Sequence, residues 1–142
     1  MLKVELHTHT GDDPADLIPY TTEQLIERAA DLGYDALAIT LHDRQLATHP
    51  FAELARRRGI VLIPGVERTI QGRHVLLLNF PAAAEQVESF EELAALKASC
   101  HGLVIAPHPF YPTSSCLRGL MNRHAALFDA VVAESGYQAY LV

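Results

Sequence analysis

Short apolar runs alternate with amphipathic patterns along most of the chain. Apolar runs that predict strands cover residues 2–6, 35–40, 60–67, 74–80, 102–107 and 129–134. Helical periodicity, with apolar residues three and four positions apart, covers residues 21–33, 51–59, 89–100 and 115–128. Because the strands alternate with helices and are apolar almost throughout, the pattern predicts an α/β fold with a buried parallel sheet or a barrel.

Cap and turn residues mark the ends of several of these elements. Thr21 or Thr22 is the predicted N-cap of the first helix, and Gly33 ends that helix. Gln71-Gly72 predicts a tight turn between the third and fourth strands. The sequence contains no repeat, low-complexity segment or linker, so we expect a single domain.

Composition places the chain among globular proteins that do not cross a membrane. Of the 142 residues, 49% are hydrophobic, and no apolar run reaches the roughly 18–20 residues of a membrane span. The N-terminal stretch MLKVELHTHT does not have the pattern of a signal peptide, so we expect a cytoplasmic protein. A formal charge of −6 opposes nucleic-acid binding, except for a short oligonucleotide taken as a substrate. Two or three bound divalent cations would offset most or all of this charge.

Polar side chains of the metal-ligand type recur at one end of the predicted strands. In α/β folds the functional groups gather at the carboxyl ends of the strands. The side chains at these positions are His7 and His9 after the first strand, His42 after the second, Glu67 at the end of the third, His74 at the start of the fourth and His108 after the fifth. Glu134 is a further candidate at the end of the last strand.

The His7-Thr8-His9 motif predicts a pair of ligands. Side chains alternate along an extended chain, so both imidazoles point to the same side. Imidazole nitrogen combined with carboxylate oxygen suits Zn, Mn or Fe. A carboxylate such as Glu67 can bridge two ions about 3.5–4 Å apart. The pattern therefore predicts a centre of two or three divalent metal ions.

In the order ELHTHT, DALAITLHD, IPGVERTIQGRHVLLLNF and IAPHPF, these motifs resemble the polymerase and histidinol phosphatase (PHP) family of metal-dependent phosphoesterases. The resemblance covers almost the whole chain. It implies an α/β fold of the PHP type, a distorted (β/α)7 barrel with its metal ions at the carboxyl ends of the strands.

The resemblance also implies an assignment of ligands. His7, His9 and Glu67 would serve one metal, and Glu67 would bridge to a second metal held by His74 and His108. His42 and an acidic residue after the His-x-His motif would serve a third metal. The spacing from the following helix favours Asp16 for that role, with Asp12 and Asp13 as alternates.

The chain departs from the family pattern at two places. Leu41 stands where members usually carry an aspartate before the histidine. The family's late Asp-x-His motif occurs nowhere in residues 1–142, and only about six strands are predicted. We therefore expect a PHP-like domain that is truncated at its C-terminal side, that has its barrel edge completed by a second copy, or that works with fewer ligands.

The predicted function is hydrolysis of a small phosphomonoester or a short phosphodiester by metal-activated water. Glu67 is the predicted catalytic carboxylate, and Arg44 and Arg68, with Arg73, lie beside ligand positions and are predicted to clamp the phosphate. Two alternatives stay open. The first is a catalytically impaired, metal-binding remnant with a structural or partner-binding role. The second is a related metal-dependent hydrolase that cleaves a C–N bond.

Overall fold

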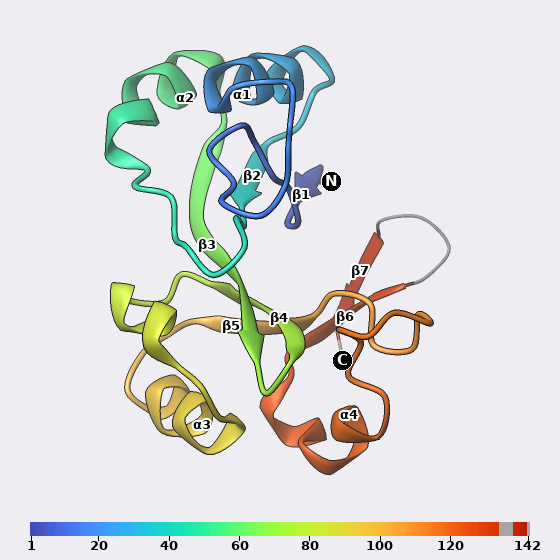
Figure 1. Ribbon diagram of the computed structural model, residues 1–142. Coiled ribbons are helices and arrows are strands. Elements are labelled where there is room, and N and C mark those ends of the chain that lie inside the picture. The colour runs from blue at the N-terminus through green and yellow to red at the C-terminus, as the bar shows by residue number, and fades with distance from the viewer. Residues whose placement is uncertain (134–137, 142) are drawn as a thin grey trace.

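The long strand β3 (Val61–Ile70) connects the two halves of the chain in the computed structural model (Figure 1). The structure describes residues 1–133 and 138–141. The other elements are β1 (Val4–Glu5), α1 (Thr22–Asp31), β2 (Ala36–Ile39), α2 (Ala52–Arg58), β4 (Arg73–Leu78), α3 (Phe90–Ala98), β5 (Leu103–Ala106), α4 (Gly119–Arg123), β6 (Ala130–Ala133) and β7 (Gln138–Leu141), with short 3-10 turns at His49–Phe51, Ala82–Gln86 and Ala125–Leu127.

The described strands form one mixed, seven-stranded sheet in the order in which they occur along the chain. β1, β2 and β3 pair in parallel, as do β5 and β6. The pairs β3–β4, β4–β5 and β6–β7 are antiparallel. In the described residues β1 and β7 are the two outer strands, so the sheet is open rather than closed.

The expectation of a distorted (β/α)7 barrel is therefore wrong, and the chain has a small α/β fold built on an open mixed sheet. A (β/α)7 barrel needs parallel strands joined by crossover helices. Here the chain passes directly from β3 to β4 through Gln71 and Gly72, which both have positive φ angles, 50° and 73°. The expected count of about six strands is also exceeded, because β7 gives seven among the described residues.

Three of the four predicted helices are confirmed, and Gly33, with a φ angle of 74°, follows the end of α1 as predicted. Thr21, not Thr22, is the N-cap of α1 and forms a capping box with Gln24. Ser89 caps α3, and Gly59 ends α2 in the left-handed conformation. No helix in residues 1–133 and 138–141 is long and apolar enough to span a membrane.

The predicted helix over residues 115–128 is mostly wrong. Only the five-residue α4 and a 3-10 turn form there. Cys116 and Leu117 are consecutive and both fully buried, and Arg118 has a φ angle of 47°. The backbone of Arg118, with φ 47° and ψ −126°, lies outside the helical region, so a helix cannot run through this residue and the segment is a loop before α4.

Three groups of buried apolar side chains hold the sheet in place. One lies between β2 and the helices α1 and α2, around Ile26 and Leu37. A second lies between α3 and strands β3 to β5, around Phe90 and Leu77. The third, around Leu76, lines the other face of the sheet. Figure 1 shows α1 and α2 beside the upper part of β3 and α3 beside its lower part.

Candidate metal centre

Glu67 lies within β3 and is the centre of a cluster of five histidines. Its side chain is 2% exposed. One carboxylate oxygen, Oε2, lies 3.0 Å from His7 Nε2, 3.1 Å from His9 Nε2 and 3.4 Å from His42 Nε2. The other oxygen, Oε1, lies 2.9 Å from His74 Nδ1 and 3.6 Å from His108 Nε2. The carboxylate thus faces one group of imidazoles with each of its oxygens.

The backbone after β1 explains how His7 and His9 reach the same oxygen. Thr8, between them, points the other way and donates a hydrogen bond from Oγ1 to the Ala38 carbonyl at 2.7 Å. The Thr8 carbonyl in turn accepts the Thr40 N–H at 2.8 Å. Alternation of side chains along this extended segment therefore places both imidazoles over Glu67, as the His-x-His pattern predicts.

The other three histidines are positioned by neighbouring strands. His42 follows β2 and forms an isolated parallel bridge with Glu67. His74 pairs with Thr69 across the β3–β4 hairpin, so it is the diagonal neighbour of Glu67 on the same face. His108 comes two residues after the end of β5. Four separate chain segments thus deliver ligand-type nitrogens to one carboxylate on a fifth.

Asp13 is the acidic residue that the structure brings closest to the histidines. Its Oδ2 lies 2.7 Å from His9 Nδ1 and 3.2 Å from His42 Nδ1, and its side chain is buried. It also accepts the backbone N–H groups of His42, Ala15 and Asp16 at 2.8–3.0 Å. Carboxylates that hold imidazoles in this way commonly orient metal ligands.

Asp16 and Asp12 lie farther from the centre. The Asp16 carboxylate is 3.9 Å from His42 Nδ1, and its side chain is 53% exposed. Asp12 accepts hydrogen bonds from the hydroxyls of Thr10 and Thr22 instead. The sequence favoured Asp16 as the acidic ligand of a third metal and gave Asp13 only as an alternate. A usable signal was the Asp-Pro pair at 13–14, because aspartate before proline is typical of a turn closed by its own side chain.

The surroundings set the protonation of these groups. Burial acts to raise the pKa of Glu67, but the imidazoles of His108, His7, His74 and His9 outweigh it and hold that pKa well below its usual value. The pKa of Asp13 is likewise lowered, because its hydrogen bonds to His9 and to backbone N–H groups outweigh its burial. For His9, burial lowers the pKa, but Glu67 and Asp13 outweigh it and raise the pKa above 6.5.

Several features of the cluster fit divalent metal ions. Three sets of donor atoms lie within 4.8 Å of one another: His7, His9 and Glu67; His42, Glu67 and His74; and His9, Asp13, Asp16 and His42. Glu67 Oε1 is buried and has no partner with hydrogen-bond geometry among the described residues, which is a costly state for an ionised oxygen unless a cation meets it. The residues present therefore fit a metal centre in which Glu67 is shared. His108 faces Glu67 but is in none of the three sets.

The arginines predicted to clamp a phosphate have other partners. Arg44 donates to the Asp12 carbonyl. Arg68 donates to the Asp43 carboxylate and to the Val87 carbonyl. The pocket at the cluster has a volume of about 300 Å³, and its lining consists of His7, His9, His42, Glu67, His74, His108 and Ser115. In the described part of the chain, no lysine or arginine lines this pocket.

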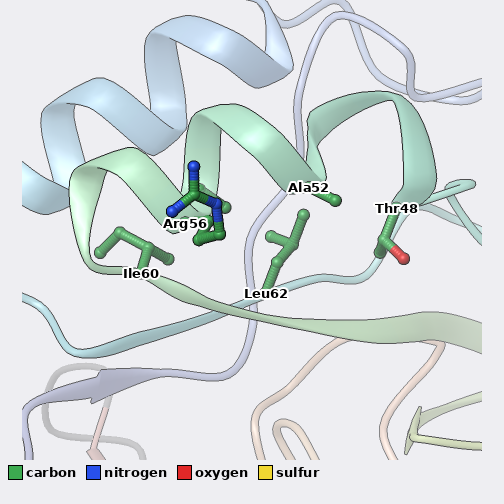
Figure 2. Close-up of a pocket in the computed structure, with 6 residues that line it drawn as sticks. Thr48, Ala52, Arg56, Ile60 and Leu62 are labelled. Atoms are coloured by element: carbon green, nitrogen blue, oxygen red, sulfur yellow. The ribbon is translucent and has the colours of Figure 1, made fainter.

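A second pocket, of about 250 Å³, has a different character. It lies between α2 and the start of β3, where Ile60 and Leu62 form its floor (Figure 2). Its one charged side chain, Arg56, is paired with Glu53 on the surface. This pocket offers no group of ligand or acid–base type, whereas the pocket at Glu67 is lined almost wholly by such groups. Glu134, the remaining sequence candidate, lies outside the described residues.

Comparison with known proteins finds a partial relationship to bacterial DNA polymerases. No family model matches the chain. A segment of 65 residues, 46% of this chain, is 42% identical to the PolC-type DNA polymerase III of Caldanaerobacter subterraneus. A segment of 68 residues, 48% of this chain, is 41% identical to the PolC-type DNA polymerase III of Streptococcus pyogenes. Each match spans 5% of the polymerase. The chain is thus similar to a small segment of these enzymes.

Proposed function

We propose that this chain is a PHP-type, metal-dependent phosphoesterase that hydrolyses a small phosphomonoester or a short phosphodiester. The observation that carries the proposal is the carboxylate of Glu67, which faces His7, His9 and His42 with one oxygen and His74 and His108 with the other. The similarity to segments of PolC-type polymerases supports it, since the family that the motifs resemble takes part of its name from polymerases.

The chain's own residues would prepare the site before any substrate binds. Glu67 stays ionised at neutral pH because its pKa is lowered, so it can act as a shared ligand. Asp13 holds the imidazoles of His9 and His42 through their Nδ1 atoms, which leaves Nε2 of each ring directed at Glu67. Divalent ions bound there would lower the pKa of water and neutralise phosphate charge.

Charge neutralisation in this proposal rests on the metal ions rather than on arginines. Arg44 and Arg68 do not line the described pocket and already donate to the Asp12 carbonyl and the Asp43 carboxylate, so both would have to move to clamp a phosphate there. The same observation favours a second candidate function, the metal-binding remnant without turnover, because the described pocket lacks a cationic side chain.

The test is elemental analysis of the purified protein followed by hydrolysis of 4-nitrophenyl phosphate and its bis ester, with and without added Mn²⁺. We expect at least two bound metals per chain and metal-dependent turnover that falls at least about 100-fold in His7→Ala. His49→Ala is the matched control, because His49 is exposed and lies in the 3-10 turn before α2. Tight metal binding without turnover would favour the remnant, and absence of bound metal would overturn both.

A further inference from the structure

The loop between His108 and Ser115 contains no residue of the types that usually bind metal ions. Ser115 is the only lining residue in the described pocket that is neither histidine nor glutamate, and His108 also lines it. These two residues are the ends of one loop, so residues 109–114 connect two points on the pocket wall. The loop therefore begins and ends at the wall of the pocket.

Backbone hydrogen bonds fix both ends of this loop. The N–H of His74 donates to the Ser115 carbonyl at 2.9 Å, and the N–H of Arg118 donates to the Pro109 carbonyl at 2.8 Å. The Arg73 guanidinium donates to the carbonyls of Ser114 and Cys116. The bonds from His74 and Arg73 tie the C-terminal end of the loop to the start of β4. A loop held in this way can present side chains at a fixed place.

Two of the four exposed residues in this loop are aromatic, and the other two are Pro112 and Ser114. Phe110 is 60% exposed and Tyr111 is 52% exposed. Because successive Cα atoms are about 3.8 Å apart, the Cα of Phe110 lies within about 7.6 Å of the Cα of His108. Neither residue lines the described pocket, so both rings lie outside its wall, where an exposed aromatic ring gains most by covering an apolar or planar group.

We propose that Phe110 and Tyr111 form a subsite that contacts a planar ring on the substrate, beside the phosphate. The inference rests on the phosphoesterase function proposed above and adds a substrate class to it. The pocket supplies ligands for the metal ions that would bind the phosphate. The loop supplies two aromatic rings and no charged side chain. Selectivity at this point is therefore for an uncharged planar group, either an aryl ring next to the phosphate or a nucleobase one sugar away.

The test measures binding, so that it does not depend on turnover. Phenylphosphonate and methylphosphonate carry the same charged group and differ by the ring. The methylene phosphonate analogues of thymidine 5′-phosphate and of 2-deoxyribose 5-phosphate differ by the nucleobase. Each is titrated by calorimetry into the Mn²⁺-loaded protein. We expect the ring-bearing member of at least one pair to bind about fivefold more tightly or better. The pair that shows the preference identifies the source of the ring.

Variants show which residues cause the tighter binding of the ring-bearing phosphonate. In Phe110→Ala/Tyr111→Ala the affinity ratio within the responding pair should fall to nearly one. Phe110→Leu keeps apolar area but removes one ring, and it should lower the ratio partly. Tyr20→Ala is the matched control, because Tyr20 is an exposed aromatic residue outside this loop. A ratio that survives the double variant, or a ratio near one for both pairs in the unaltered protein, would overturn the inference.

The same titrations keep this inference apart from the proposed function. If methylphosphonate binds only when Mn²⁺ is present and the ring adds nothing, the metal centre stands and the subsite is wrong. If no phosphonate binds the Mn²⁺-loaded protein, or the protein takes up no Mn²⁺, the proposed function fails and the subsite, which rests on it, fails with it.

Discussion

At the residue scale, Glu67 depends on its neighbours for its charge. A carboxylate that is 2% exposed would normally be protonated at neutral pH, because burial disfavours the ionised form. The facing imidazoles reverse this and lower its pKa. The position of Glu67 at the end of an apolar run singled it out in the sequence. The division of five imidazoles between its two oxygens depends on tertiary structure and could not be predicted from the sequence.

Asp13 and Asp16 offer a direct test of which carboxylate serves the centre. Asp13→Asn should weaken Mn²⁺ affinity by about 10–100-fold, because Asp13 holds the Nδ1 atoms of His9 and His42. Asp16→Asn, at a side chain that is 53% exposed, should change it less than about threefold. Calorimetric titration with Mn²⁺ measures both. A larger loss in the Asp16 variant would show that Asp16 is the ligand and that Asp13 is not needed.

Metal affinity should fall as the pH is lowered. An imidazole must be neutral to bind a metal, and the pKa of His9 is raised above 6.5 by Glu67 and Asp13. Protons therefore begin to compete at a higher pH than for a free histidine, and loss of metal should be nearly complete by about pH 5. Titrations with Mn²⁺ between pH 8 and pH 5 follow this, with phosphatase activity as a second readout. Affinity or activity that stays flat over this range would contradict the prediction.

At the element scale, strands and helices were predictable where local signals were strong. Thr21 with Gln24 and the Gln71-Gly72 turn appear in the structure as capping box and hairpin turn. The segment from Ser115 to Phe128 has the apolar spacing of a helix, but the non-helical backbone angles of Arg118 interrupt it. Local periodicity cannot show which of two competing packings wins.

The close packing before β5 can be tested at Gly102. A Cβ added there would collide with the ring of Phe80, which is 4% exposed in the core beside α3. Gly102→Ala should lower the free energy of unfolding by about 1–3 kcal/mol. Gly119→Ala is the matched control, because no atom of the described residues outside its chain neighbours and its own helix backbone lies within 4 Å of a Cβ placed there. Urea denaturation measures both, and equal midpoints for the two variants would refute this account of the packing.

Asp43 joins the loop after β2 to β3, and its contribution should depend on pH. Burial would raise its pKa, but the Thr69 N–H and the Arg68 guanidinium outweigh burial and lower it. A carboxylate with a lowered pKa stabilises the fold above its unfolded pKa, near 3.9, and loses that effect as the pH falls through its folded pKa.

Asp43→Asn should therefore destabilise the protein at pH 7 by up to about 1 kcal/mol, a modest value because the Asp43 side chain is 43% exposed. The difference between variant and unaltered protein should shrink below about pH 4 and approach a small constant at pH 2. Urea denaturation at pH 7, 4 and 2 measures it. A difference that grows on acidification would have the wrong sign for a lowered pKa.

At the scale of the whole molecule, the main error of the sequence-based prediction was the direction of the strands, because the sheet is mixed rather than parallel. The apolar runs of β2, β4 and β5 reflect burial on both faces of the sheet, which holds for parallel and antiparallel strands alike. The two-residue turn after Ile70 was the informative signal, since it allows only an antiparallel return. Pairing of an outer strand with a second copy stays a prediction, which sedimentation analysis can test.

Because the sheet is open, metal ions bound at the cluster should stabilise the folded state in addition to any role in catalysis. The candidate ligands His7 and His9 follow β1, whereas His74 and His108 belong to β4 and the loop after β5, with Glu67 on β3 between them. Ions held by these residues would join segments that are far apart in the sequence. A ligand that binds the folded state alone stabilises it by about 2.7 kcal/mol when its free concentration is 100 times its Kd.

We therefore expect Mn²⁺ at that concentration to raise the free energy of unfolding by about 2.7 kcal/mol for each bound ion and EDTA to reverse the change. His7→Ala and His74→Ala should each lose most of the effect, because each removes a ligand from a different part of the sheet. His49→Ala should keep it, since His49 is exposed outside the cluster. Urea denaturation with and without Mn²⁺ measures all four proteins. If only His7→Ala loses the stabilisation, the metal is held by the N-terminal ligands alone and does not tie the two parts of the sheet together.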